Sequence, residues 1–291
     1  MRKKIRRTIL LLLAAVVLVA VAQNFTLTVA RYDVASIKIP AAFEGYKILQ
    51  LSDLHSAEFG EGNQKLYQKI RKLDPDVILA TGDMLNSTQD DGAVFLSLAE
   101  ELAGVYPIYY IFGNHEMLVW EYHEEFFLNY IDRLTQLGVH VMHNQRVELT
   151  RGDEKIYLYG YDMPLRYYNS RSYLGETGGD LCAQDLRGAI GMPGEGVYTV
   201  LAAHHPAFSD VYAGWGADLT FAGHLHGGVV RIPFVGGLLS PDLEFFPEQD
   251  RGMYEMGDGA LVVSAGIGNS VIQFRLFNPP QLVLVTLHAP D

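Results

Sequence analysis

Five short segments of the chain combine Asp, Asn and His residues, most of them next to glycine or proline. They contain six of the ten histidines. The segments are Asp53-Leu54-His55, Gly82-Asp83, Gly113-Asn114-His115-Glu116, His204-His205-Pro206 and Gly223-His224-Leu225-His226. Carboxylate, amide and imidazole donors without thiolate suit Mn, Zn, Fe or Co rather than a soft metal ion. The sequence therefore predicts divalent metal binding, and the glycines let the backbone approach an ion or an anion closely.

The spacing of these residues matters as much as their types. Asp53 and His55 stand two positions apart, which places a carboxylate and an imidazole on the same side of an extended segment. Alone, such a pair, or the pair Gly82-Asp83, is more often a turn or a helix cap. The ordered set is more informative, because each segment directly follows a predicted strand. Open α/β sheets bind ligands at the carboxyl ends of their strands, so we expect the five segments to meet at one site.

Short apolar runs alternate with stretches of helical period, which indicates an α/β fold. The strands expected before the polar segments are Tyr46–Leu51, Val77–Thr81, Pro107–Phe112, Val197–Ala203 and Leu219–Ala222. Further strands are expected at Val139–His143, Gln145–Thr150, Lys155–Tyr161, Leu261–Ser264 and Leu282–Leu287. Apolar residues at helical spacing predict helices around Leu66–Leu73, Phe95–Leu102 and Phe126–Leu137. The strand-rich second half favours a mixed sheet system over a purely doubly wound sheet.

The N-terminus differs in character from the rest of the chain. A basic run, Met1–Arg7, precedes an uncharged stretch, Thr8–Ala30, that is long enough to span a bilayer. The apolar core of this stretch also has signal-peptide length, and Ala20-Val21-Ala22 resembles a cleavage site. Residues 1–30 are therefore predicted to be a signal-anchor or a cleaved signal peptide, and residues 31–291 to be a single domain.

The charge distribution predicts where that domain lies and what it does not bind. The positive-inside rule places it outside the cytoplasm, at the cell membrane on a single N-terminal span, or secreted if the segment is cleaved. Five of the 22 Lys and Arg residues precede Thr8, so 17 cations face 34 acids in the remainder, whose net charge is −17. Such a surface repels nucleic acid, which we do not expect as a stable partner. One cysteine, Cys182, excludes an intramolecular disulfide framework.

In type and order, the five polar segments resemble those of the calcineurin-like metallophosphoesterase superfamily, over about residues 44 to 288. Further features resemble the membrane-associated bacterial branch of this superfamily. They are the basic and apolar N-terminus, Arg231 after the Gly-His-x-His-Gly-Gly motif, and the C-terminal motifs Arg251-Gly-x-Tyr and Arg275-Leu-Phe-x-Pro-Pro. The resemblance implies a four-layer α/β/β/α sandwich around two packed sheets.

The resemblance also implies a role for each site residue. Asp53, His55 and His226 would hold one divalent ion, and Asn114, His204 and His224 a second, with Asp83 bridging the two. Two such ions, Mn, Zn, Fe or Co, lower the pKa of a shared water and stabilise charge during displacement at phosphorus. His115 would contact the phosphate and help the leaving oxygen depart. Neighbours on a strand point to opposite faces, and the family pattern His-x-Pro selects His204 over His205, which we expect in the surrounding pocket.

One departure from the broad family concerns Asn86, which replaces the second acid of Gly-Asp-x-x-Asp. We expect this neutral side chain to orient His115 without raising its basicity. The Arg-Gly pair of protein Ser/Thr phosphatases is also absent, since Ser87 and Thr88 follow. This argues against a protein phosphatase.

The predicted function is hydrolysis of a phosphate ester by a dinuclear metal centre, with a phosphodiester favoured over a phosphomonoester. A membrane tether favours a phospholipid or a lipid-linked sugar phosphate as substrate. The aromatic segments Trp120–Tyr130 and Tyr161–Tyr173 either form an apolar rim for such a group or face the core. Arg231 and Arg275 either bind phosphate or form structural ion pairs. The alternative functions are a catalytically silent scaffold of this fold at the membrane, and metal storage.

Overall fold

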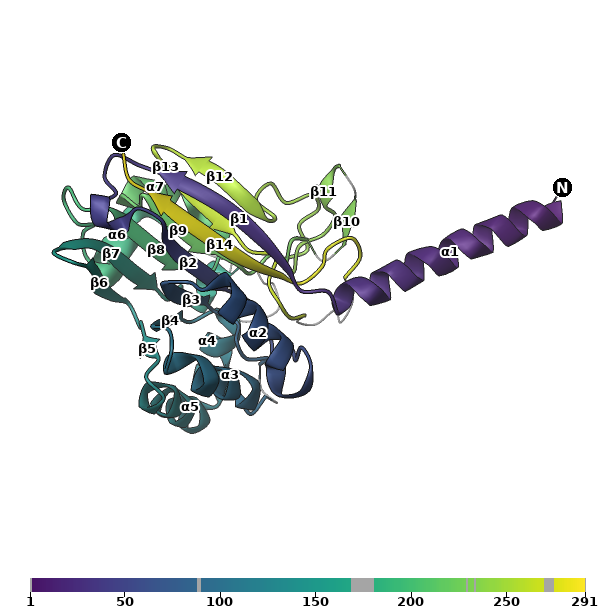
Figure 1. Ribbon diagram of the computed structural model, residues 1–291, viewed down its shortest axis with the longest axis horizontal. Helices are drawn as coiled ribbons and strands as arrows, with labels where there is room; N and C mark the ends of the chain where they lie inside the picture. The colour runs from purple at the N-terminus through teal and green to yellow at the C-terminus, as the bar shows by residue number, and fades with distance from the viewer. Residues whose placement is uncertain are drawn as a thin grey trace.

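Two six-stranded sheets form the centre of the molecule, here described from a computed structural model (Figure 1). The structure describes residues 2–87, 90–168, 181–228, 230–232, 234–269 and 275–290, so that Thr88 and Tyr173 of the sequence argument lie outside it. The strand orders are β1-β14-β2-β3-β4-β5 and β12-β13-β9-β8-β7-β6, and β10 and β11 form a separate two-stranded ribbon. Both large sheets are mixed, as the sequence predicted.

In the first sheet, β2, β3, β4 and β5 are parallel, β14 is antiparallel to β2, and β1 is parallel to β14. Its strands are β1 (Thr28–Ala35), β2 (Tyr46–Leu51), β3 (Val77–Thr81), β4 (Ile108–Ile111), β5 (His140–Val141) and β14 (Gln281–His288). The expected bounds of β2 and β3 are confirmed. No strand was expected at β1, an edge strand whose pairing with β14 joins residues far apart in the sequence.

In the second sheet, β13, β9, β8 and β7 are parallel, with β12 and β6 antiparallel at the edges. Its strands are β6 (Gln145–Arg151), β7 (Glu154–Tyr161), β8 (Thr199–Ala203), β9 (Leu219–Ala222), β12 (Gly252–Met256) and β13 (Gly259–Val263). The ribbon consists of β10 (Arg231–Ile232) and β11 (Gly236–Gly237).

Apolar side chains between the sheets and on their outer faces hold the layers together. Ile48, Leu79 and Val285 of the first sheet pack against Val200 and Phe221 of the second. The outer face of the first sheet is covered by α2 (Gln64–Leu73), α3 (Ala93–Ala103), α4 (Asn114–Tyr122) and α5 (Glu124–Gln136). The outer face of the second is covered by α6 (Ala183–Ile190) and α7 (Ser209–Trp215). The predicted four-layer α/β/β/α sandwich is therefore confirmed. Short 3-10 turns lie at Ala41–Phe43, Glu61–Asn63, Leu165–Tyr167 and Pro206–Phe208.

A single long helix, α1 (Arg2–Asn24), projects from one end of the sandwich (Figure 1). Its most apolar window has a mean hydropathy of 2.3 and is 0% buried, so by length and composition it is able to cross a membrane. The helix ends at Asn24, whereas the sequence grouped the residues as far as Ala30 with the apolar segment. Residues 28–30 instead begin β1, because their backbone pairs with β14.

Candidate metal site

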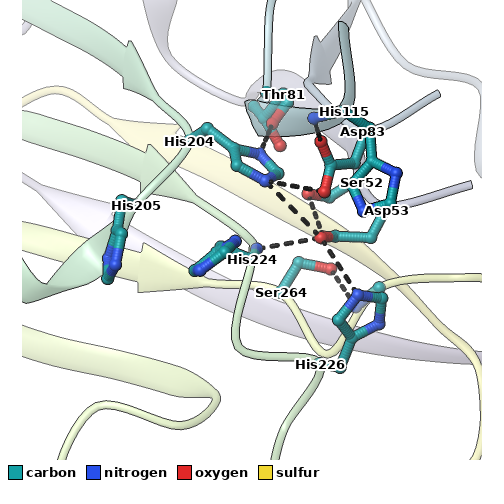
Figure 2. A network of polar contacts seen from close by, with 12 residues as sticks. Ser52, Asp53, Thr81, Asp83, His115, His204, His205, His224, His226 and Ser264 are labelled. Atoms are coloured by element: carbon teal, nitrogen blue, oxygen red, sulfur yellow. Dashed lines mark hydrogen bonds and ion pairs between the residues drawn. The ribbon is translucent and has the colours of Figure 1, made fainter. Parts of the chain in front are cut away.

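The five polar segments meet where β2, β3, β4, β8 and β9 end, at the same edge of the two facing sheets (Figure 2). Asp53 follows β2, Asp83 follows β3 and His204 follows β8. All three are buried, with at most 1% of their surface exposed. Burial of several ionisable groups at one point is costly unless each is paired or coordinates an ion.

The first group of donors is Asp53, His55 and His226, whose potential ligand atoms all lie within 4.8 Å of one another. The Nε2 atoms of His55 and His226 are 3.1 Å apart, and Nε2 of His226 is 3.6 Å from Oδ1 of Asp53. Two imidazoles bound to one ion at about 2.1 Å each have nitrogens roughly 3 Å apart. The spacing of the two rings therefore fits a common divalent ion.

The second group is Asp83, His204 and His224. Nδ1–H of His204 donates to the Thr81 carbonyl at 2.6 Å, and its Nε2 lies 3.2 Å from Oδ2 of Asp83. A hydrogen bond of this kind orients a metal-binding imidazole and leaves the other nitrogen for the ion. Asn114 adds a buried Oδ1 atom that has no hydrogen-bond partner among the residues the structure describes, which also fits an oxygen donor to a cation.

Asp83 lies between the two groups. Its Oδ2 atom is 3.2 Å from Nε2 of His204 and 3.7 Å from Nε2 of His55, and its Oδ1 atom accepts the backbone N–H of His115 at 2.9 Å. Asp53 is fixed in a similar way, since Ser52 Oγ–H and the N–H of His224 donate to its two oxygens. Both carboxylates are therefore held in place by groups that are not themselves needed as ligands.

The pKa shifts of the site residues reflect their burial and the charges of the neighbouring carboxylates and histidines. Burial, and then the neighbouring His115, lower the pKa of His55 to about 3, so this ring is neutral, the form that binds cations. Burial alone would lower the pKa of His204, but the charge and hydrogen bond of Asp83, the charge of Asp53 and the Thr81 carbonyl together outweigh it and raise this pKa to about 10. The histidines in turn lower the pKa of Asp83 against the effect of its burial. The carboxylates thus attract positive charge, which divalent ions would supply.

The backbone of the site adopts an uncommon conformation. Asp53, His55, Asp83, His224 and His226, five of the seven expected ligands, have φ values between 44° and 66°. Non-glycine residues rarely occupy this left-handed region, and those that do cluster at functional sites. Gly223 permits the close approach, because a Cβ atom there would overlap Oγ of Ser52 and Oδ2 of Asp53.

Glu116 holds the loop that carries Asp83, a role that sequence reasoning missed. Its buried carboxylate accepts the backbone N–H groups of Asp83, Met84, Leu85 and Gly113 at 2.7–3.1 Å. The sequence contained a signal for this role, because Glu116 is the last residue of the Gly-Asn-His-Glu segment and occupies the third position of α4. There its carboxylate caps the helix.

Asp242 is a second residue that sequence reasoning missed. Its Oδ2 atom lies 3.1 Å from Nε2 of His224 and 3.3 Å from Nε2 of His205. Nδ1 of His205 accepts the N–H of Ala207, so the neutral His205 ring carries its proton on Nε2 and donates it to Asp242. His205 points away from the two metal groups, and His204 points toward them (Figure 2). No sequence signal marks Asp242, which lies in an irregular loop after β11.

The N–H of Ser87 orients His115, and not the Asn86 amide as the sequence suggested. It donates to Nδ1 of His115 at 3.0 Å, whereas the Asn86 amide donates to the carbonyl of His55. With Nδ1 as acceptor, the neutral His115 ring carries its proton on Nε2. Burial lowers the pKa of His115, which favours this neutral form.

The sequence left open whether Arg231 and Arg275 bind phosphate or form structural ion pairs, and both form structural contacts. Arg275 is 1% exposed, donates to the carbonyls of Ala265 and Gly268, and lies 3.2 Å from Nδ1 of His226. Its charge contributes, after burial and His55, to the lowered pKa of His226. Arg231 forms an ion pair with Asp250 at 2.7 Å.

The two aromatic segments divide between core and pocket. Phe127 and Tyr130 are buried in the core. Trp120, from the first segment, and Leu165 and Arg166, from the second, line a pocket of about 700 Å³. Tyr168 packs against the metal site itself, with its ring centroid 5.2 Å from that of His224. Because Trp120 belongs to α4, the pocket of about 700 Å³ lies beside this helix, which begins with Asn114 and His115.

Comparison with known proteins agrees with this geometry. A family model described as calcineurin-like phosphoesterase matches residues 46–228. The chain is 24% identical to the uncharacterized metallophosphoesterase YkuE of Bacillus subtilis, over 89% of this chain and 85% of that protein. It is 25% identical to phosphodiesterase YaeI of Escherichia coli, over 88% of this chain and 87% of that protein. It is also 25% identical to a transmembrane protein with metallophosphoesterase domain of Bos taurus, over 87% of this chain and 55% of that protein.

The family model spans more than half of the chain, and its matched region contains all five polar segments that meet at the strand ends. The chain therefore belongs to the calcineurin-like phosphoesterase family.

Proposed function

We propose that the chain hydrolyses phosphate esters with two divalent ions. Asp53, His55 and His226 hold one ion, Asn114, His204 and His224 hold the other, and Asp83 bridges them. The observation that carries the proposal is the place of Asp83, whose Oδ2 atom lies within 3.7 Å of Nε2 in His55 and in His204, one histidine from each group. When bound, such ions stabilise charge on the phosphoryl oxygens and lower the pKa of water at the site.

His115 stabilises the leaving oxygen in this proposal. Its Nδ1 atom accepts the N–H of Ser87, so the neutral ring carries its proton on Nε2, which donates a hydrogen bond to the leaving oxygen of the ester and stabilises the charge that develops there. The neutral ring is the dominant form near pH 7, because burial lowers its pKa. Asp53 and Asp83 are held by backbone and hydroxyl donors, so the donor geometry exists before substrate binds.

The favoured substrate is a phosphodiester, and a lipid or a lipid-linked sugar phosphate is the candidate class. The name of the relative YaeI, a phosphodiesterase, supports the first point, and the helix α1 supports the second. The pocket lined by Trp120 and Leu165 has room for an organic group beside α4, the helix whose first residues are Asn114 and His115. A silent scaffold is the competing function, but scaffolds of this fold would be expected to lose ligands, and this chain has a suitable donor at all seven positions.

The test compares the full chain, purified in detergent and stripped of metal, with Asp83→Asn. Mn²⁺ is restored, and turnover is measured on an aryl phosphodiester, an aryl phosphomonoester and a glycerophospholipid. We expect metal-dependent turnover in the wild type and in the exposed control Asp132→Asn, but not in Asp83→Asn. A folded, metal-loaded wild type that turns over none of the three would support the scaffold instead.

The proposed location is the outer side of the cell membrane, with residues 1–30 as a retained anchor or a cleaved signal peptide. Cys182 is the only cysteine and is exposed, so it reports the side on which the domain lies. A membrane-impermeant maleimide should label it in intact spheroplasts as fully as in lysed ones. Labelling only after lysis would contradict a domain on the outer side of the membrane. The mass of the recovered chain shows whether the N-terminal segment is retained as an anchor or cleaved as a signal peptide.

A further inference from the structure

Exposed apolar side chains gather on the ribbon of β10 and β11 and on the loop that follows it. Phe234 is fully exposed, at 108% of its reference surface, and Val235 is 64% exposed. Leu243 follows at 75%, together with Phe245 and Phe246 at 68% and 52%. Soluble surfaces rarely concentrate large apolar residues in this way, and such patches mark contacts with a partner or a membrane.

A basic pocket of about 380 Å³ opens among these residues. Its lining includes Arg231, Arg251, Phe234, Val235 and Phe277. A cavity of this size lies within the range of small-ligand pockets.

The two arginines of this pocket differ in their partners. Arg231 is neutralised by Asp250 at 2.7 Å. The guanidinium of Arg251 donates to the neutral Oδ1 atom of Asn278, and among the described residues it forms no ion pair within 4.0 Å, although the backbone N–H of Arg251 donates to Asp250 at 2.6 Å. Burial and then the neighbouring charge of Arg231 lower the pKa of Arg251, although the charge of Asp250 acts in the opposite direction, and a bound anion would reduce the remaining cost. The pocket thus carries unpaired positive charge in a chain whose net charge is −12.

Hydrogen bonds place this pocket next to the end of α1. The side chain of Asn24, the last residue of α1, accepts the backbone N–H of Arg275 and donates to its carbonyl. The adjacent carbonyl of Leu276 accepts the N–H of Arg231, the first residue of β10, at 2.9 Å. In Figure 1, β10 and β11 accordingly lie at the end of the sandwich from which α1 projects. The segment that carries the apolar patch therefore lies at the end of the molecule where a membrane-spanning α1 would leave the bilayer.

We propose that the ribbon and its pocket form a docking site for an anionic phospholipid of the membrane that α1 enters. The headgroup phosphate binds Arg251, and Phe234 and Val235 enter the bilayer interface. An arginine beside exposed aromatic and aliphatic groups is the combination that anionic membrane surfaces attract, whereas a protein partner would not need to lie beside a membrane span. The proposal rests on α1 as a span but not on hydrolysis, since none of the proposed metal ligands lines the pocket. Asn278 connects the two sites, because it accepts from Arg251 and donates to the carbonyl of His226.

The experiment measures contact with lipid directly, without turnover. The full chain carries Cys182→Ser and either Phe234→Cys or Ile37→Cys, each labelled with an environment-sensitive fluorophore. Ile37 is the matched control, because it is 88% exposed but lies beyond the opposite end of β1. Each protein is reconstituted in nanodiscs of phosphatidylcholine with increasing phosphatidylglycerol, and doxyl groups on the acyl chains act as quenchers.

We expect quenching at position 234 to be several-fold stronger than at position 37 and to increase with phosphatidylglycerol. Arg251→Gln should raise the phosphatidylglycerol fraction at half-maximal quenching about fivefold, and the exposed control Arg133→Gln should not. Equal quenching at positions 234 and 37 would overturn the proposal. Strong quenching at position 234 that changes neither with the phosphatidylglycerol fraction nor in Arg251→Gln would overturn the headgroup site. Neither result depends on whether the metal centre is active.

Discussion

The carboxylate of Asp242 lies 3.1 Å from Nε2 of His224, across 18 positions of sequence. An N–H donated from Nε2 to this carboxylate leaves Nδ1 of His224 without a proton and therefore open to an ion. A carboxylate behind a metal-binding histidine fixes both the tautomer and the direction of the ring. Asp242 thus acts on the metal site through His224.

Asp242→Asn should weaken binding of the second metal ion about 10- to 100-fold. The amide of Asn retains the size of the side chain, but it offers one oxygen to two imidazole N–H groups. Calorimetric titration of the stripped protein with Mn²⁺ measures the change, and Asp258→Asn, an exposed substitution, is the control. Equal affinities in the variant and the wild type would remove Asp242 from the site.

His115→Asn should lower kcat about 100- to 10,000-fold while the protein still binds two ions. The reason is that His115 donates a hydrogen bond to the leaving oxygen in the proposed reaction but is not assigned as a ligand. Steady-state kinetics and metal analysis of the same sample separate the two effects. His123→Asn, an exposed histidine outside the five segments, is the control, and loss of metal in the His115 variant would show that it is a ligand instead.

Glu116→Gln should lower the free energy of unfolding by about 2–4 kcal/mol at pH values above 7, because the carboxylate accepts several N–H groups and is replaced by an amide. The pH matters because burial, and then the charge of Asp83, raise the pKa of Glu116 to about 7. One oxygen would remain to accept, and the new NH₂ group would face the backbone donors of either Asp83 and Gly113 or Met84 and Leu85. Denaturant unfolding of the metal-free proteins gives the difference, with the exposed Glu195→Gln as control. A change no larger than that of the control would mean that water replaces the lost bonds.

A pH-dependent contribution to stability is expected from His288, far from the metal site. Its ring nitrogens lie 2.9 Å from Glu44 and 3.1 Å from Asp33, and these carboxylates raise the pKa of His288 above its usual 6.5. A raised histidine pKa stabilises the fold fully below 6.5 and loses this effect as the pH rises through the folded pKa. The pKa of Glu44 is lowered from 4.5, mainly by its bond with His288, so its contribution is lost as the pH falls below that value.

His288→Gln should therefore lower Tm slightly between about pH 4.5 and 6.5 and have no effect at pH 9. The effect is small because the three side chains are exposed to solvent. Thermal unfolding at several pH values tests this, with His140→Gln as the matched control. A destabilisation that is equal at pH 6 and pH 9 would assign the role of His288 to packing rather than charge.

Local patterns in the sequence were enough for the strands that lead to the site. The apolar runs Tyr46–Leu51, Val77–Thr81 and Leu219–Ala222 are buried over nearly their whole length, so composition marks both their ends. Their alternation with amphipathic helices indicated an α/β fold, and the α/β/β/α layering was implied by the resemblance to the metallophosphoesterase superfamily. Two elements were not predicted from local patterns. Strand β1 is only half-buried, and the first residues of α4 belong to the polar segment that begins at Gly113.

The sequence by itself determined which donors the site contains, since Asp, Asn and His recur after successive strands, and it predicted their order along the chain. Only the tertiary structure decided which residues orient them. Asp242 reaches His224 and His205 from an irregular loop, and Glu116 joins two loops through backbone N–H groups. Arg251 meets Arg231 in a pocket beside the end of α1. These contacts depend on how distant segments close against one another, and no local periodicity records that closure.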